Sequence, residues 1–209
     1  MESSAIPRED PTRSQPEVAV GWKPADPGPL GLGAFAMTTF VLSMFNSNLV
    51  DVKGLPVVLG LALAYGGIVQ LLAGMWEFRT GNTFGALAFC SFGAFWISFW
   101  ALEVFYAKQI GGNAGHAVGV YLWAWAIFTA YMTVAALRVS GAVLLVFVLL
   151  TITFVLLAIG ATGAHETVTH WGGYLGLATA AAAWYASFAA VTNSTFGRTV
   201  LPVFPLSGR

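Results

Sequence analysis

Hydrophobic residues run through the chain in six long stretches, which polar residues interrupt only at short connections. Each stretch has about the 20 mostly apolar residues that an α-helix needs to cross a bilayer, and the runs do not alternate as a membrane β-strand would. The pattern therefore predicts an all-α integral membrane protein with six transmembrane helices, at about Leu30–Leu49, Pro56–Glu77, Phe84–Val104, Ala117–Leu137, Gly141–Gly160 and Trp171–Val191.

Composition supports this class. Hydrophobic residues make up 57% of the chain and charged residues only 9%, against about 25% charged residues in soluble domains. The net charge is zero and no basic run appears, so we expect the lipid bilayer and no nucleic acid as a partner. The single cysteine, Cys90, has no partner for an intrachain disulfide.

Basic residues set the expected orientation. Seven Lys and Arg residues fall on the side of the two tails and only two on the other side. Because basic loops stay in the cytoplasm, both termini are predicted to be cytoplasmic. We divide the chain into a mobile cytoplasmic N-terminal tail (1–25), a six-helix transmembrane domain (26–195) and a short cytoplasmic C-terminal tail (196–209). The expected location is the cell (plasma or inner) membrane.

The densest group of polar residues lies around the second connection. Gln70 and Glu77 fall on one helix face with two glycines, and we expect this face to point away from the lipid. Asn82 and Thr83 can cap the amides that open the next helix. We interpret this unit as part of a transport path.

Two helix starts are predicted on the cytoplasmic side, at Leu30 and Gly31 and at Asn82 and Thr83. Their positive dipole ends could collect an anion, or they could be ordinary helix starts. Asp26 could cap the first of them.

Carboxylates inside membranes often carry protons. Glu77 and Asp26 are thus the candidates for a proton linkage. The alternative for Glu77 is an interfacial charge beside Arg79.

The span interiors contain no Lys or Arg, and their polar side chains are neutral, among them Thr38, Asn46, Gln70 and Ser91. Such groups can hydrogen-bond a carboxyl group without the cost of a buried charge, or they can bond neighbouring backbones. We expect no metal and no cofactor.

The enzyme alternative rests on His165 and His170. These histidines are five residues apart in an expected loop, whereas a zinc-protease helix needs them four apart. We therefore expect no catalytic residues and no enzyme.

Several motifs resemble those of the acetate uptake transporter family, in particular its bacterial succinate–acetate permease members. The first is the D-P-G-P-L-G-L stretch from Asp26 to Leu32. The others are Y-G-G-I-V-Q (65–70), G-N-T-F-G (81–85), F-G-A-F-W (92–96), G-V-Y-L (119–122) and F-G-R-T-V-L-P (196–202).

The resemblance implies six helices per subunit, a hexamer, and passage of acetate and often succinate, by proton coupling or as a channel. It also implies a constriction formed by Phe35, Phe92 and Leu150, and a path-lining region that contains Ala183. This chain has Phe92 where relatives carry Tyr, and Asp26 where the signature has Asn.

We expect proton-linked transport of acetate and other short carboxylates, with succinate as a further candidate substrate. The alternatives are an uncoupled acetate anion channel and, in another class, a membrane sensor or assembly protein that does not transport.

Overall fold

The computed structural model describes residue 22 and residues 24–206. The predicted N-terminal tail (1–25) lies almost entirely outside the described residues.

The described chain forms six membrane-length helical spans, as the hydrophobic pattern predicts. The first is α1 (Gly28–Asn46), and a short 3-10 turn (Val52–Gly54) leads to the second. The second span consists of α2 (Pro56–Leu63), a π-helical turn (Ala64–Val69) and α3 (Gln70–Thr80). The third consists of α4 (Thr83–Ala101), a π-helical turn (Leu102–Tyr106) and α5 (Ala107–Ile110). The last three spans are the single helices α6 (Ala114–Ala136), α7 (Gly141–Gly163) and α8 (Glu166–Phe196). A 3-10 turn (Gly111–Asn113) joins α5 to α6.

Local sequence explains where these helices begin and end. Pro29 lies in the first turn of α1, where a proline removes no intrahelical hydrogen bond. Gly81 ends α3 with φ of 80°, a left-handed conformation that glycine adopts without strain. The next helix begins at once, because the Asn82 side chain accepts a hydrogen bond from the Gly85 amide.

The last helix differs most from the prediction. α8 runs from Glu166 to Phe196 and is longer at both ends than the predicted span. The expected loop at His165–His170 is wrong, since residues 166–170 form the first turns of α8. Hydropathy detects only the part of a helix that lies in hydrocarbon, and polar residues extend this helix beyond it.

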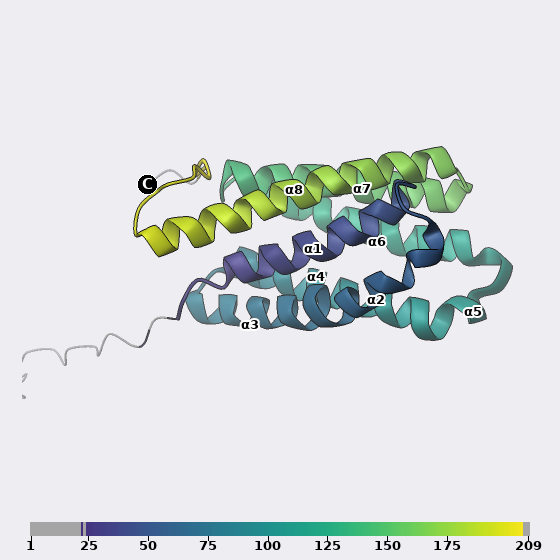
Figure 1. Cartoon of the computed structure of the whole chain (residues 1–209), viewed down its shortest axis with the longest axis horizontal. Coiled ribbons are helices and arrows are strands. Elements are labelled where there is room, and N and C mark those ends of the chain that lie inside the picture. Colours follow the sequence, from purple (N-terminus) through teal and green to yellow (C-terminus); the bar gives the residue numbers. More distant parts are fainter. Residues whose placement is uncertain (1–21, 23, 207–209) are drawn as a thin grey trace, which may run out of the picture.

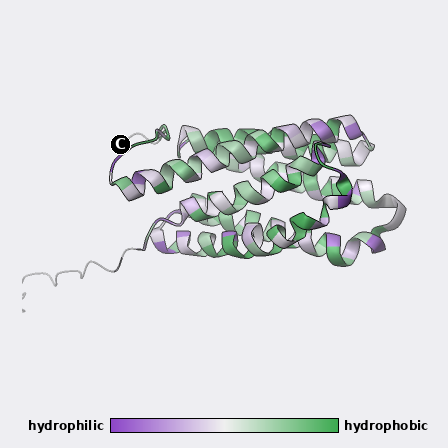
Figure 2. Ribbon diagram, in the orientation of Figure 1, coloured by the Kyte–Doolittle hydropathy of each residue, from purple (hydrophilic) through white to green (hydrophobic). Residues whose placement is uncertain are grey.

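Neighbouring spans pack closely. α1 packs along α8, α8 along α7 and α7 along α6, while α3 packs along α4. Close approach needs small residues, as is usual for membrane helices. At Gly74 of α3, a Cβ would lie 2.5 Å from the Cys90 nitrogen of α4. Figure 2 shows hydrophobic residues along the middle of the helices and hydrophilic residues gathered near their ends.

The two described ends of the chain lie at the same end of the bundle (Figure 1). We call this the tail end; it holds the starts of α1, α4 and α7. The opposite end, with the turns around residues 52 and 111, is the loop end. An even number of spans places both chain ends together, and which side faces the cytoplasm stays a prediction from charge.

Residues 197–206 fold back over the tail end of the bundle. The Gly141 amide at the start of α7 donates to the Phe204 carbonyl oxygen over 2.7 Å. Asn193 holds the same segment, because its side-chain oxygen accepts from the Val200 and Leu201 amides at 2.7 and 2.9 Å. We call residues 197–206 the C-terminal strap.

Candidate functional site

Two cavities lie along the bundle and share two apolar lining residues. The loop-end cavity has a volume of about 330 Å³ and the tail-end cavity about 210 Å³. Phe35 of α1 and Leu150 of α7 line both of them. These two side chains therefore stand at the boundary between the cavities.

Phe92 of α4 completes this boundary from the tail-end side. It lines the tail-end cavity, and its ring centroid lies 5.6 Å from that of Phe35. Phe35, Phe92 and Leu150 are all buried. The structure thus brings the three predicted constriction residues together, and their function as a constriction stays a prediction.

An aromatic cluster holds Phe92 in place. The rings whose centroids lie within 6.5 Å of it, apart from Phe35, come from α6 and α7: Trp125, Phe128, Phe147 and Phe154. Aromatic pairs at these separations add to the stability gained by burial. The boundary between the cavities is therefore apolar, and aromatic rings from α6 and α7 fix the position of Phe92 in it.

The tail-end cavity contains the predicted polar pair of the second span. The Gln70 side chain is 0% exposed, and both its amide nitrogen and its amide oxygen lack a hydrogen-bond partner among the described residues. A buried amide without partners costs about 1–3 kcal/mol. Since Gln70 lines the cavity, a ligand carboxyl group there could supply the missing partners.

Glu77 lies on the same face of α3, about two helical turns further toward the tail end, and is 2% exposed. One of its carboxylate oxygens accepts a hydrogen bond from the Thr80 hydroxyl at 3.1 Å. Gly85 makes room for it, because a Cβ there would lie 2.7 Å from the Glu77 carboxyl carbon. None of the described residues that line this cavity is a Lys, Arg or His.

Among the described residues, Glu77 is not paired with Arg79, the partner that the alternative of an interfacial charge assigned to it. The carboxylate is buried, whereas the exposed Arg79 side chain donates to the Trp22 carbonyl oxygen over 3.5 Å. Proton linkage through Glu77 stays a prediction.

Of the four predicted helix-start residues, Asn82 lines the tail-end cavity, and Leu30, Gly31 and Thr83 do not. Asn82 caps α4 by accepting a hydrogen bond from the Gly85 amide at 3.1 Å. Before α1, Asp26 also lines the cavity, and its carboxylate accepts from the Gly28 amide at 2.8 Å. Leu30 and Thr83 are exposed, and the Gly31 amide donates to the Pro27 carbonyl oxygen over 3.1 Å. The geometry fits ordinary helix starts better than bare anion sites.

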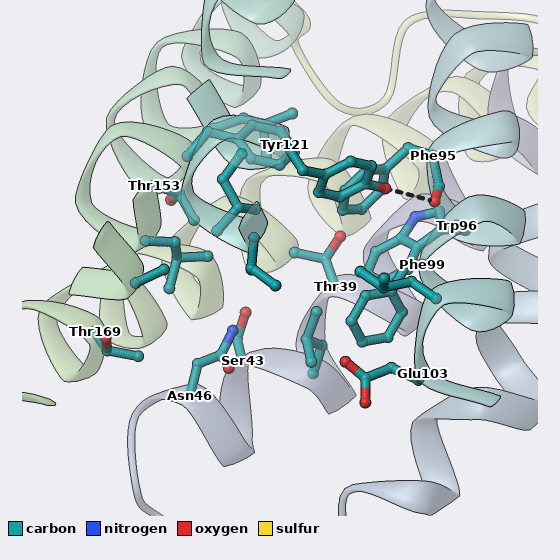
Figure 3. Close-up of a pocket in the computed structure, with 18 of the residues that line it drawn as sticks. Thr39, Ser43, Asn46, Phe95, Trp96, Phe99, Glu103, Tyr121, Thr153 and Thr169 are labelled. Carbon is teal, nitrogen blue, oxygen red and sulfur yellow. Dashed lines mark hydrogen bonds between the residues drawn. The ribbon is translucent and has the colours of Figure 1, made fainter. Parts of the chain in front are cut away.

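The loop-end cavity has more polar groups than we predicted (Figure 3). The Thr39 hydroxyl and the Trp96 indole nitrogen are buried and lack a hydrogen-bond partner among the described residues. Ser43, Asn46 and Glu103 also line it. The Tyr121 hydroxyl bonds the Phe95 carbonyl oxygen at 3.2 Å, the contact drawn dashed in Figure 3, and it bonds Ser98 at 2.7 Å.

Three of the predicted path residues line neither cavity. Thr38 is buried and donates to the Ala34 carbonyl oxygen over 3.0 Å. Ser91 is half-buried, and Ala183 is buried in the hydrophobic core. The small-residue face of α8 does reach the tail-end cavity, through Ala186 and Ala190. Of the predicted set, Asn46 and Gln70 are the ones that line a cavity.

One signal could have found the residues that were missed on α1. The α1 residues that line the loop-end cavity are separated by steps of four, three, one and three: Phe35, Thr39, Leu42, Ser43 and Asn46. These steps describe one face of a helix. Phasing the polar residues of α1 on both Phe35 and Asn46 would have selected Thr39 over Thr38, because Thr39 lies four residues after Phe35 and seven, or about two turns, before Asn46.

The sequence matches the GPR1/FUN34/yaaH family over residues 13–208. Two Saccharomyces cerevisiae relatives are longer than this chain, which spans 66% and 62% of their lengths. One of them, Ammonia transport outward protein 2, is 43% identical over 175 residues, or 81% of this chain. The Escherichia coli Succinate-acetate/proton symporter SatP is 40% identical over 184 residues, which cover 87% of this chain and 96% of SatP.

A solved structure has the same architecture. It is described as that of the bacterial acetate channel SatP and superposes with a TM-score of 0.80 and 39% identity. The match covers 87% of this chain and 99% of the other chain.

Proposed function

The chain belongs to the GPR1/FUN34/yaaH family, and from this premise we propose that it carries acetate and other short carboxylates across the cell membrane. Membership agrees with the resemblance inferred from the motifs, and the match to the SatP channel confirms the six-helix fold class. The protein is a multi-pass membrane protein with six apolar helices.

The observation that carries the proposal is the pair of cavities that meet at Phe35 and Leu150. Each cavity is lined by buried polar groups that have no hydrogen-bond partner in the described part of the chain: Gln70 in the tail-end cavity, and Thr39 and Trp96 in the loop-end cavity. A carboxyl group has two oxygens that accept hydrogen bonds from amide, hydroxyl and indole donors. A short carboxylic acid could therefore supply the hydrogen-bond partners that these side chains lack among the described residues.

The apolar boundary between the cavities is the proposed gate. Phe35, Phe92 and Leu150 offer no hydrogen-bonding side chain, so a substrate that passes them must leave its water behind. Burying a charged group is far more costly than burying a neutral polar one. The gate thus favours a small substrate that crosses as its uncharged acid.

Glu77 is the residue proposed for proton linkage. Its carboxylate is buried in the lining of the tail-end cavity. None of the described residues in that lining has a cationic side chain. Asp26 is the weaker candidate, because its carboxylate accepts the Gly28 amide hydrogen bond. The predicted orientation puts this cavity on the cytoplasmic side.

An uncoupled acetate channel is the second candidate, since the solved relative is described as a channel. The open cavities weigh against a sensor or assembly protein that has lost its path. A hexamer, expected from the resemblance, stays part of the proposal.

Uptake of radiolabelled acetate into proteoliposomes, with and without an imposed pH gradient, tests the proposal. Accumulation that a protonophore collapses establishes proton coupling. Uptake that only equilibrates and follows membrane voltage establishes a channel. No flux above that of protein-free vesicles, from folded protein, refutes transport of acetate.

A further inference from the structure

Glu103 is the acidic residue in the lining of the loop-end cavity. It lies in the π-helical turn Leu102–Tyr106 that follows α4. Figure 3 shows its carboxylate extending from beside Phe99 toward the part of α1 that carries Ser43 and Asn46. π-helical turns are frequent at functional sites.

The described lining of the loop-end cavity offers Glu103 no compensating positive charge. None of the described residues that line the loop-end cavity is a Lys, Arg or His. The other titratable side chain in the lining is Tyr121, whose hydroxyl is bonded to Ser98 and to the Phe95 carbonyl oxygen. A substrate in this cavity therefore meets a carboxylate that no basic side chain neutralises.

Size does not decide which carboxylate can enter. Cavities of about 300–1,000 Å³ hold drug-sized ligands, and the loop-end cavity has about 330 Å³. A four-carbon dicarboxylate fits as well as acetate does. Charge is what distinguishes the two substrates.

We propose that Glu103 makes this protein selective for monocarboxylates by excluding dicarboxylates such as succinate from the loop-end cavity. A dianion is repelled twice and a monoanion once, while an uncharged acid is not repelled. At about 7 Å and an effective dielectric constant of about 30, each unit of charge lowers occupancy about ten-fold. This inference rests on the proposed transport of carboxylates and specifies its substrate class.

The test compares succinate and acetate uptake in proteoliposomes at neutral pH for the wild type, Glu103→Gln, Glu103→Asp and Glu166→Gln. Glu103→Gln should raise the succinate-to-acetate ratio about ten-fold, and Glu103→Asp should leave it low. Glu166 is the matched control, since it is an exposed carboxylate at the loop end. It lines an outer recess that shares Asn46 and Thr169 with the cavity.

A binding measurement separates this inference from the proposed function. Ligand-induced thermal stabilisation of the detergent-solubilised protein reports affinity without flux. Both ligands should stabilise Glu103→Gln more than the wild type, and the gain should be about twice as large for the dianion succinate as for the monoanion acetate. If the wild-type protein shows no acetate flux, the proposed function is refuted. The binding comparison then still tests whether Glu103 excludes dicarboxylates from the loop-end cavity.

Two results overturn the role of Glu103. One is a Glu103→Gln variant with the succinate-to-acetate ratio and the succinate stabilisation of the wild type. The other is a Glu166→Gln variant that changes the ratio as much as Glu103→Gln does. That outcome assigns the selectivity to the surface potential at the loop end.

Discussion

Replacing Leu150 by Ala removes one of the two side chains that stand between the cavities. Leu150 lines both cavities and is buried. Phe92 packs against several aromatic rings, so truncating it would disturb the fold as well as the boundary. Leu150→Ala is therefore the sharper test of the gate.

The expected cost to stability is moderate. Truncation of a buried Leu to Ala costs about 2–5 kcal/mol, and the loss is larger when the site cannot collapse. Here the removed atoms border open space on both sides, so the neighbouring cavities become continuous. The variant should retain its fold while the barrier to a wider acid falls. A fall of about 1.4 kcal/mol corresponds to a ten-fold increase in rate.

Lactate is a suitable probe because it is an acid with one more carbon than acetate. We expect Leu150→Ala to raise lactate uptake relative to acetate uptake about ten-fold in proteoliposomes. Leu145→Ala is the control, since Leu145 lies on the same helix, is exposed and lines neither cavity. An unchanged ratio in folded Leu150→Ala protein, or an equal change in Leu145→Ala, refutes the gate.

Three further variants test other parts of the site. Glu77→Gln keeps a partner for the Thr80 hydroxyl but cannot release a proton, so acetate accumulation driven by a pH gradient should be lost while equilibrating uptake continues. Accumulation equal to that of the wild type contradicts a role of Glu77 in proton coupling. Gln70→Leu removes a buried amide that has no hydrogen-bond partner among the described residues, so the free energy of unfolding should rise by about 1–3 kcal/mol while the affinity for acetate falls. A variant that is less stable than the wild type in thermal unfolding means that Gln70 has a structural partner. Asn193→Ala removes the side chain that bonds the Val200 and Leu201 amides, so the C-terminal strap should become more sensitive to protease while the helices remain resistant; equal cleavage of the strap in wild type and variant shows that other contacts hold it.

Hydrophobic length predicted the number and order of the spans because the bilayer imposes it. Capping residues located individual ends, as at Asn82, since a helix start needs side-chain acceptors for its free amides. The length of α8 could not be predicted, because Glu166 and Asn193 extend the helix beyond the part that hydropathy detects. The C-terminal strap depends on long-range hydrogen bonds to α7, which no local pattern reports.

The site was predictable where spacing alone fixes a helix face. Gln70 and Glu77 fall on one face of the second span, and both line the tail-end cavity. Glu103 in the lining of the loop-end cavity was missed for a different reason. Glu103 follows α4 in a π-helical turn, and such a turn shifts the facing of the residues within it from the 3.6-residue period. Its position at the end of an apolar run gave no sign of the cavity.

The apolar boundary also bears on how a proton could be coupled to the substrate. At pH 7, protonating a carboxyl group with a pKa of about 4.3 costs about 3.7 kcal/mol. Stripping the water from an ionised carboxylate costs considerably more, because a charge in an apolar medium loses its solvation. Between Phe35 and Leu150, crossing as the acid is therefore the easier route, and each molecule of acetate takes one proton with it. Coupling of this kind needs no chain of proton carriers through the gate, but it does need a group beside the gate that exchanges the proton with acetate, and Glu77 in the tail-end cavity is the group proposed for this. It also predicts that Leu150→Ala, by admitting water between the cavities, makes acetate flux more dependent on membrane voltage.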